Sequence, residues 1–94
     1  MAGYWIGRGA EIVDADALQE YGKLWPEIAA RFGAEVIAGK GRSETREGPE
    51  YARQLIVRFD SYEQALDCYD SPEYQEAMKL ALRASARELT IVEG

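Results

Sequence analysis

Four short stretches of strand-forming residues alternate with two stretches of helical periodicity, and this order limits the fold more than any other feature. The strand-forming stretches are residues 4–13, 35–39, 53–59 and 89–92. Apolar residues at three- and four-residue spacing predict one helix after the first stretch and a second helical region after the third. The predicted order of elements is therefore β-α-β-β-α-β.

Right-handed crossovers convert this order into an α+β fold, a ferredoxin-like plait with a four-stranded antiparallel sheet and both helices on one face. The strand at residues 53–59 then has two different faces. One face carries Leu55, Val57 and Phe59, and the other carries Gln54, Ile56 and Arg58. The first set suits the helices, whereas the second set is half polar. Packing two such open faces together would enclose a partly polar cavity, so we expect a homodimer.

The ends of the first helix are predicted from local signals. Asp14 or Asp16 is expected to cap its beginning, because short acidic side chains accept hydrogen bonds from free backbone amides. Gly33 is expected to end it in the left-handed conformation. Pro26 predicts a kink or a restart near residues 24–25, because proline removes a helical hydrogen bond.

The second helical region is expected to begin at Ser61, which forms a capping box with Gln64. It is expected to break at residues 70–72, with Pro72 starting a new segment capped by Ser71 or Asp70. The solvent face of that segment is predicted to carry Glu73, Glu76, Lys79, Arg83 and Arg87.

Composition excludes several functional classes. The 94 residues form one domain over residues 1–94, and no apolar run is long enough for a transmembrane helix. The N-terminus lacks the layout of a signal peptide, so a cytoplasmic location is expected. With 17 acidic and 11 basic residues, neither nucleic acid nor an anionic membrane is expected as a partner. The chain has no histidine and one cysteine, so no metal site and no cofactor are expected.

Several strings in the chain are also found together in one family. The most specific is Phe59-x-Ser61 followed by Tyr-Asp-Ser-Pro-Glu-Tyr-Gln at residues 69–75. The others are Gly-Tyr-Trp-Ile at residues 3–6, Tyr21, Pro26, Gly33, Glu47-Gly48 and Ile-Val-Glu-Gly at residues 91–94. Over essentially its whole length the chain resembles the domain of unknown function 1330 family, of the dimeric α/β-barrel superfamily.

This resemblance implies a ferredoxin-like fold that pairs into a dimeric α/β barrel, but it supplies no established activity. Superfamily relatives include cofactor-independent monooxygenases, isomerases and dehalogenases, and fold alone transfers none of these chemistries. The chain departs from the family pattern at Ala34, where members often carry glycine. It also departs at Arg58, where members often carry glutamate, so the charge on the face assigned to the cavity is reversed.

Charged residues on the predicted strands suggest a ligand site. Arg8 and Arg58 are expected to clamp a carboxylate or an enolate, because guanidinium groups pair well with planar anions. The alternative is a structural ion-pair network. The other candidate ligand-binding residues are Trp5, Tyr69 and Glu93. Tyrosines are candidate hydrogen-bond donors, with core packing as the alternative: Tyr4, Tyr21, Tyr62, Tyr69 and Tyr74.

Two functions remain open from the sequence. The first is a small protein that binds or transforms an anionic or enolisable molecule in the barrel cavity without a cofactor. The second is a non-catalytic homodimer that serves as a structural or regulatory module. A large cavity lined by the charged residues favours the first function, whereas an interior filled by side chains favours the second.

Overall fold

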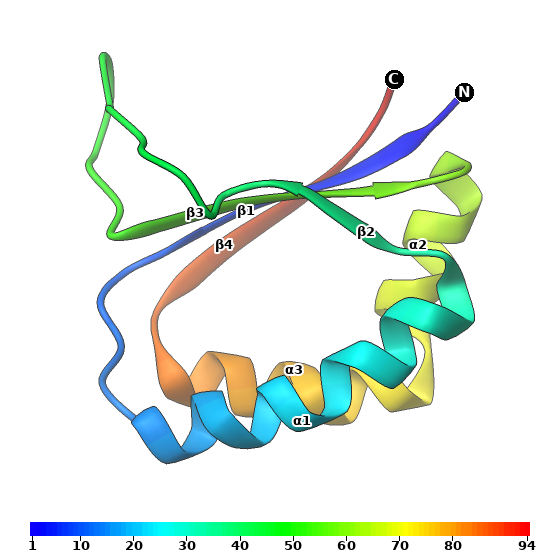
Figure 1. The fold of residues 1–94 in the computed structure, drawn as a ribbon, viewed down its shortest axis with the longest axis horizontal. Helices are drawn as coiled ribbons and strands as arrows, with labels where there is room; N and C mark the ends of the chain where they lie inside the picture. Colours follow the sequence, from blue (N-terminus) through cyan, green and yellow to red (C-terminus); the bar gives the residue numbers. More distant parts are fainter.

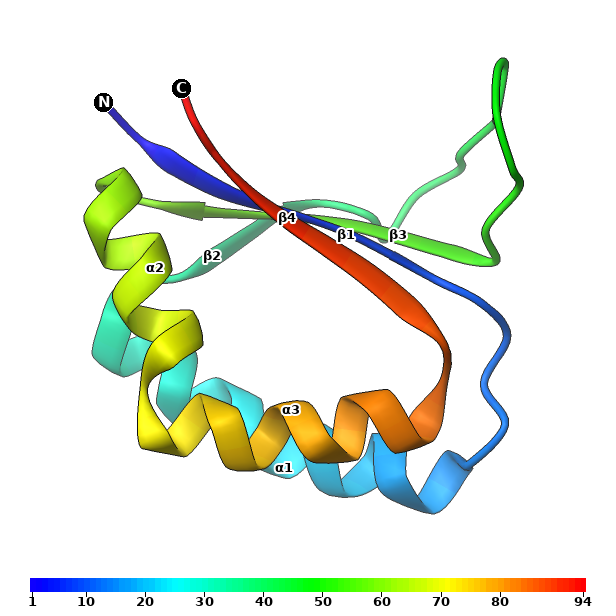
Figure 2. The same ribbon diagram turned by 180° about the vertical axis from the view of Figure 1, so that it is seen from behind.

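The four strands form one antiparallel sheet in the order β2-β3-β1-β4, in a computed structural model that describes all 94 residues. In chain order the elements are β1 (Gly3–Gly9), α1 (Ala15–Phe32), β2 (Glu35–Ala38), β3 (Arg53–Phe59), α2 (Tyr62–Asp70), α3 (Pro72–Ala84) and β4 (Arg87–Glu93). All three helices lie on the same side of the sheet (Figures 1 and 2). The predicted ferredoxin-like plait is confirmed. None of the helices is both long and apolar enough to cross a membrane.

The strand register determines which side chains face the helices. Trp5 of β1 pairs with Val57 of β3 and with Ile91 of β4, so these three residues share the helix side. Val57 and Phe59 are buried there, as predicted, and the Trp5 indole donates a hydrogen bond of 2.9 Å to the Ala65 carbonyl of α2. The opposite face of the sheet has no helix above it.

Helix α1 begins and ends as its sequence predicts. Asp14 accepts a hydrogen bond of 3.0 Å from the Ala17 amide, and Gly33 adopts a left-handed φ of 65°. Of the kink or restart predicted near residues 24–25, the restart is wrong, because a single helix continues through Pro26. Pro26 leaves the Gly22 carbonyl without its helical donor, and both residues are exposed, so water can satisfy that carbonyl.

The break between α2 and α3 is confirmed, and it depends on Ser71. The Ser71 hydroxyl accepts from the Tyr74 amide (3.2 Å) and donates to the Cys68 carbonyl (2.7 Å). At the start of α2, Ser61 accepts from the Gln64 amide as predicted. The other half of the capping box does not form. The Gln64 side chain instead donates a bond of 2.6 Å to the Phe32 carbonyl at the end of α1.

Two strand boundaries differ from the prediction by two residues or more. β1 ends at Gly9 instead of residue 13, because the chain then leaves the sheet and the Val13 amide donates to the Ala84 carbonyl at the end of α3. β4 begins at Arg87, two residues earlier than predicted. The predicted place of Arg87 on the solvent face of a helix is therefore wrong, and its side chain is half-buried in the sheet.

Strand β2 is short, and this leaves the first part of β3 paired with β1 but without a neighbour on its other side. β2 ends at Ala38, which pairs with Ile56, so residues 53–55 have no β2 residue beside them. The following residue, Gly39, has a φ of 125°, and a side chain there would collide with the Gln54 carbonyl oxygen. The chain therefore crosses closely against β3 before residues 40–52 rise away from the sheet (Figure 1).

Candidate functional site

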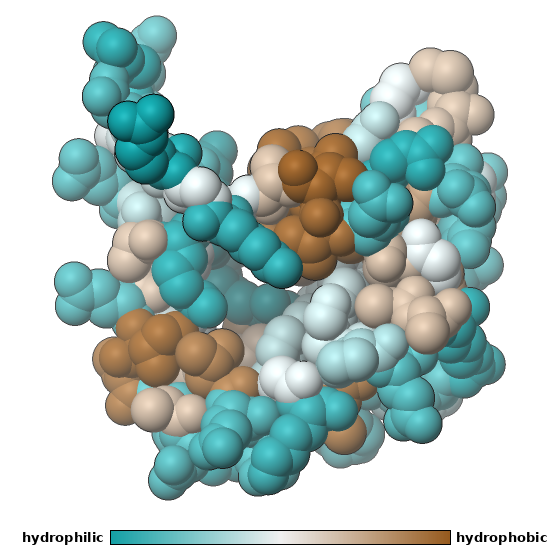
Figure 3. All heavy atoms as spheres, viewed as in Figure 1, coloured by the Kyte–Doolittle hydropathy of each residue, from teal (hydrophilic) through white to brown (hydrophobic).

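A cavity of about 680 Å³ is lined by the sheet, by α1 and α3, and by residues 39–43. Its volume falls within the range of small-molecule binding sites. The lining includes Leu18 and Tyr21 of α1 together with Ile6 and Arg8 from the opposite face of the sheet. The cavity therefore extends around the free edge of β3, and the space-filling view shows a hollow between the sheet and the helices (Figure 3).

Gly7 of β1 leaves part of the cavity free of side chains. Gly7 pairs with Leu55 and Leu89 and lies on the same side of the sheet as Trp5. A Cβ atom at Gly7 would meet no atom closer than the Glu88 carbonyl oxygen, 3.9 Å away. The middle of the sheet thus carries no side chain at this point, and the cavity reaches the backbone.

Aromatic side chains from α1 and α3 form the wall opposite the sheet. The rings of Tyr21 and Trp25 are stacked, with an interplanar angle of 8° and centroids 6.4 Å apart. Tyr74 makes edge contacts with both of these rings and with Trp5. All four residues line the cavity, so the wall is both apolar and supplied with two phenol groups.

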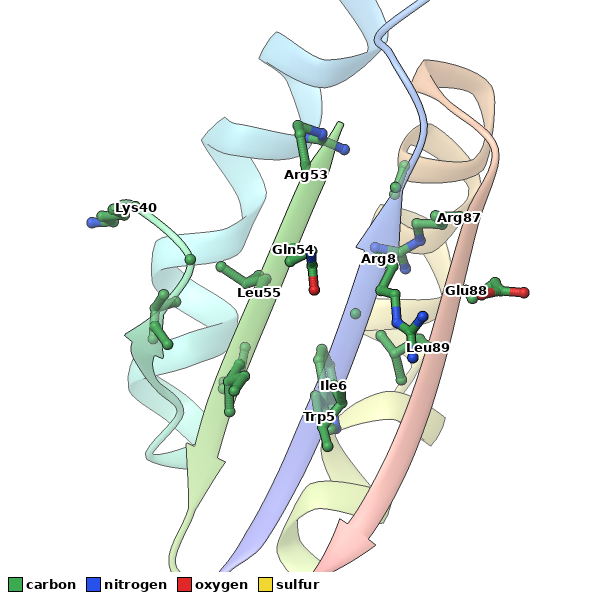
Figure 4. Close-up of a pocket in the computed structure, with 18 of the residues that line it drawn as sticks. Trp5, Ile6, Arg8, Lys40, Arg53, Gln54, Leu55, Arg87, Glu88 and Leu89 are labelled. Carbon is green, nitrogen blue, oxygen red and sulfur yellow. The ribbon is translucent and has the colours of Figure 1, made fainter. Parts of the chain in front are cut away.

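The charges that line the cavity are strongly unbalanced. Five cationic residues line it, namely Arg8, Lys40, Arg42, Arg53 and Arg87, against the single carboxylate of Glu88. Figure 4 shows Arg8, Lys40, Arg53 and Arg87 together with Glu88. None of the five forms an ion pair. Glu88 instead accepts a hydrogen bond of 2.6 Å from Tyr51. The cavity is therefore locally positive in a chain whose net charge is −6.

Arg87 and two tyrosines form a chain of hydrogen bonds in the cavity wall. The Arg87 guanidinium donates to the Tyr74 phenol oxygen at 2.7 Å, and the Tyr74 and Tyr21 phenol oxygens are 3.1 Å apart. The same guanidinium lies 6.0 Å from the centre of the Tyr21 ring. This group connects the first residue of β4 with α3 and then with α1.

The Tyr21 phenol remains protonated at neutral pH. Burial, and secondly the neighbouring Tyr74, raise the pKa of Tyr21 well above its usual value, while the charge of Arg87 acts in the opposite direction. The raising effects are the larger ones. Tyr21 can therefore serve as a hydrogen-bond donor in this cavity, but not as a base.

The structure separates the five candidate residues predicted from the sequence. Trp5 and Arg8 line the cavity, whereas Arg58, Tyr69 and Glu93 do not. Glu93 is exposed at the far end of β4, and the Tyr69 hydroxyl donates to the Met78 sulfur at 3.1 Å.

The expected clamp of Arg8 and Arg58 is not formed within one chain. Arg58 pairs with Tyr4, four residues before Arg8 on β1, which corresponds to about 13 Å along a strand. The Arg58 guanidinium instead forms an ion pair of 3.2 Å with Asp60.

Sequence reasoning missed Arg53 and Arg87 as cavity residues, although a signal for both is present. On β3 the positions that face the helices include Leu55, Val57 and Phe59, and the next such position toward the N-terminus is Arg53. The alternation of Leu89 and Ile91 leads back to Arg87 in the same way. Both arginines therefore begin their strands on the helix side of the sheet.

These features define a ferredoxin-like α+β protein with a positively charged cavity that extends from the helix side of the sheet around the free edge of β3. The chain belongs to the family described as Domain of unknown function (DUF1330), which matches residues 2–94. A comparison with curated proteins finds no match.

Solved structures of other proteins share the fold. A protein of unknown function from Rhodopseudomonas palustris has a TM-score of 0.73 at 17% identity, covering 99% of this chain and 82% of that one. A dimeric ferredoxin-like protein of unknown function from Jannaschia sp. has a TM-score of 0.74 at 11% identity, covering 100% of both chains. SnoaB, a cofactor-independent oxygenase from Streptomyces nogalater, has a TM-score of 0.62 at 13% identity, covering 99% of this chain and 92% of its own. At these identities the likeness shows the fold.

Proposed function

We propose that this protein binds a small organic anion, a carboxylate or an enolate, in the cavity between its sheet and its helices. The observation that carries the proposal is the set of five cationic side chains without ion pairs around a cavity of about 680 Å³. Unpaired guanidinium groups bind carboxylates strongly because they donate two parallel hydrogen bonds to a planar anion.

The net charge of −6 does not oppose this proposal. Salt screens interactions between exposed charges beyond about 8–10 Å, so the acidic outer surface acts only weakly on a ligand inside the cavity. Arg87 is half-buried in the cavity wall, where its interaction with an anion is stronger than that of an exposed charge. Local charge therefore decides which ligand is bound, and the overall charge slows its approach.

We also propose that the chain acts as a homodimer, formed by packing two open sheet faces together. This face carries Ile6 with 37% of its surface exposed, alongside its cross-strand partner Ile56. Exposed apolar groups of this kind are typical of subunit interfaces. The dimeric description of the Jannaschia protein supports the same arrangement.

The alternative is a non-catalytic structural or regulatory module. An interior filled by side chains would favour that function, whereas Gly7 leaves the helix side of the sheet open. The open cavity therefore supports ligand binding. A cofactor-independent oxygenase is among the proteins that share this fold, and this supports a function on a small molecule without a cofactor.

The proposal is tested by thermal unfolding with benzoate and with benzamide, which has almost the same shape and no charge. A ligand that binds only the folded state raises the midpoint of unfolding. We expect benzoate to raise it in a concentration-dependent and salt-sensitive manner and benzamide to have little effect. Equal shifts, or none with benzoate, would overturn the proposal.

A further inference from the structure

We propose that Tyr21 is the hydrogen-bond donor to the anionic oxygen of the ligand, and that Tyr74 and Arg87 are positioning residues that fix the direction of this donation. The inference rests on the proposed function of the cavity. The inference names the protein group that contacts the ligand, the Tyr21 hydroxyl, and it predicts that the ligand oxygen bound there is anionic.

The direction of the hydrogen bonds follows from a count of donors and acceptors. A guanidinium group carries only donors, so the Tyr74 oxygen must be the acceptor in its bond of 2.7 Å with Arg87. Tyr74 is fully buried, and its own proton therefore needs an acceptor within the protein. The acceptor that the structure provides is the Tyr21 oxygen at 3.1 Å.

This leaves the hydroxyl proton of Tyr21 without an acceptor in the protein. Tyr21 is only half-buried and lines the cavity, so its proton is available to a ligand there. The opposite direction, with Tyr21 donating to Tyr74, would leave a fully buried proton without a partner. Arg87 thus determines the direction of donation along the whole chain of hydrogen bonds, from Arg87 to Tyr74 and from Tyr74 to Tyr21.

A site of this kind selects the ligand by the charge on its oxygen. The Tyr21 hydroxyl donates to an acceptor, and the nearby charge of Arg87 stabilises negative charge on it. A carboxylate, phenolate or enolate fits this site, whereas an ammonium or an amide N–H does not. For a ligand that is a weak acid, the site favours the ionised form and lowers the pKa of the bound molecule.

The stacked rings of Tyr21 and Trp25 lie beside this hydroxyl, and the bare backbone of Gly7 lies on the sheet side of the cavity. Both surfaces line the same cavity of about 680 Å³. We therefore choose a planar weak acid as the probe. The probe is 4-nitrophenol, because its phenolate form has a distinct visible absorbance.

The experiment titrates 4-nitrophenol with pH in the presence and absence of the protein. We expect the bound phenol to ionise at lower pH, with a preference of about tenfold or more for the phenolate. Tyr21→Phe should bind the probe but lose most of this preference, and Tyr74→Phe should reduce it by disconnecting Arg87. Tyr69→Phe is the matched control, because its hydroxyl bonds to Met78 outside the cavity, and it should leave the preference unchanged.

The outcomes separate this inference from the proposed function. If benzoate and 4-nitrophenolate both fail to bind the parent protein, the proposed function and the inference fall together. If either anion binds but the phenol pKa is not lowered, only the inference is overturned. The same holds if either anion binds and both Tyr21→Phe and Tyr69→Phe behave like the parent. A loss of preference in Tyr69→Phe equal to that in Tyr21→Phe would also overturn it, because it would indicate a general effect on packing.

Discussion

The Arg87 guanidinium donates a hydrogen bond of 2.7 Å to the Tyr74 phenol oxygen, and so joins the first residue of β4 to the first turn of α3. The partner of the guanidinium in this bond is a phenol, and Arg87 forms no ion pair with a carboxylate. The bond therefore orients the guanidinium without neutralising it. A half-buried arginine in this state provides a positive charge that is available to a ligand.

Arg53→Met is expected to weaken benzoate binding, because Arg53 lines the cavity and its only side-chain partner is the neutral Ser85 hydroxyl at 3.3 Å. Loss of one charge-assisted contact should reduce affinity by about tenfold. Calorimetric titration measures this change. The matched control is Arg58→Met, which removes an arginine from the same strand but outside the cavity. An equal or larger loss in the control would restore the hypothesis that Arg58 holds the ligand.

Ile56→Asp is expected to weaken dimerisation, because it places a charge in an interface between two open sheet faces. Sedimentation at micromolar concentration measures the effect. Leu82→Asp is the matched control, since Leu82 is 52% exposed on α3, away from the sheet. A parent protein that sediments as a monomer would contradict the dimer, and so would identical profiles for Ile56→Asp and the parent.

Ser71→Ala is expected to lower the free energy of unfolding by about 1–2 kcal/mol, since it removes the cap of α3. It also removes a donor to the Cys68 carbonyl in a position where Ser71 is only 7% exposed. Urea unfolding measures the change. Ser43→Ala, on an exposed loop, should stay close to the parent value. Equal stability of the two variants would show that Ser71 does not act as a cap.

The stability of the protein is expected to fall as pH rises above about 9. Burial raises the pKa of the Cys68 thiol from 9.0 to about 12. Between these values the unfolded state releases a proton that the folded state keeps, so unfolding becomes more favourable. Urea unfolding from about pH 8 to about pH 10 should show a weaker decline in Cys68→Ala than in the parent. The same slope in both proteins would mean that this thiol is not protected by burial.

The arrangement of the elements and the helix ends could be predicted from local patterns. Alternation along β3 correctly assigns its two faces, and Ser71 caps α3 because its role depends only on the neighbouring residues. The strand ends could not be predicted in this way. Residues 10–13 continue the apolar pattern of β1 but leave the sheet for a backbone contact with the end of α3.

The candidate site was harder to predict, because it depends on register and on missing side chains. Arg8 and Arg58 both carry the right chemistry, but the pairing of β1 with β3 places them at different ends of the open face. Gly7 carries no side chain at the centre of the sheet, so the cavity reaches the backbone there. A single sequence indicates that a glycine is present, but it does not show what space that glycine leaves.

Gly7 provides the most direct test that the ligand occupies the cavity and not an outer surface. A side chain at Gly7 would project into the cavity, and no atom lies within 3.4 Å of its Cβ position. Gly7→Val should therefore fold at least as stably as the parent, because valine favours strands and glycine does not. Gly22→Ala, on the exposed face of α1, is a matched control that also removes a glycine but does not line the cavity, and its Cβ would meet no atom within 4 Å.

The deciding measurement is calorimetric titration of benzoate into the parent, Gly7→Val and Gly22→Ala proteins, each shown to be folded by its unfolding transition. We expect binding to the parent and to Gly22→Ala, and a loss of at least about tenfold in affinity for Gly7→Val because its side chain fills the space of the ligand. Equal affinity of all three proteins for benzoate would contradict a ligand site in this cavity.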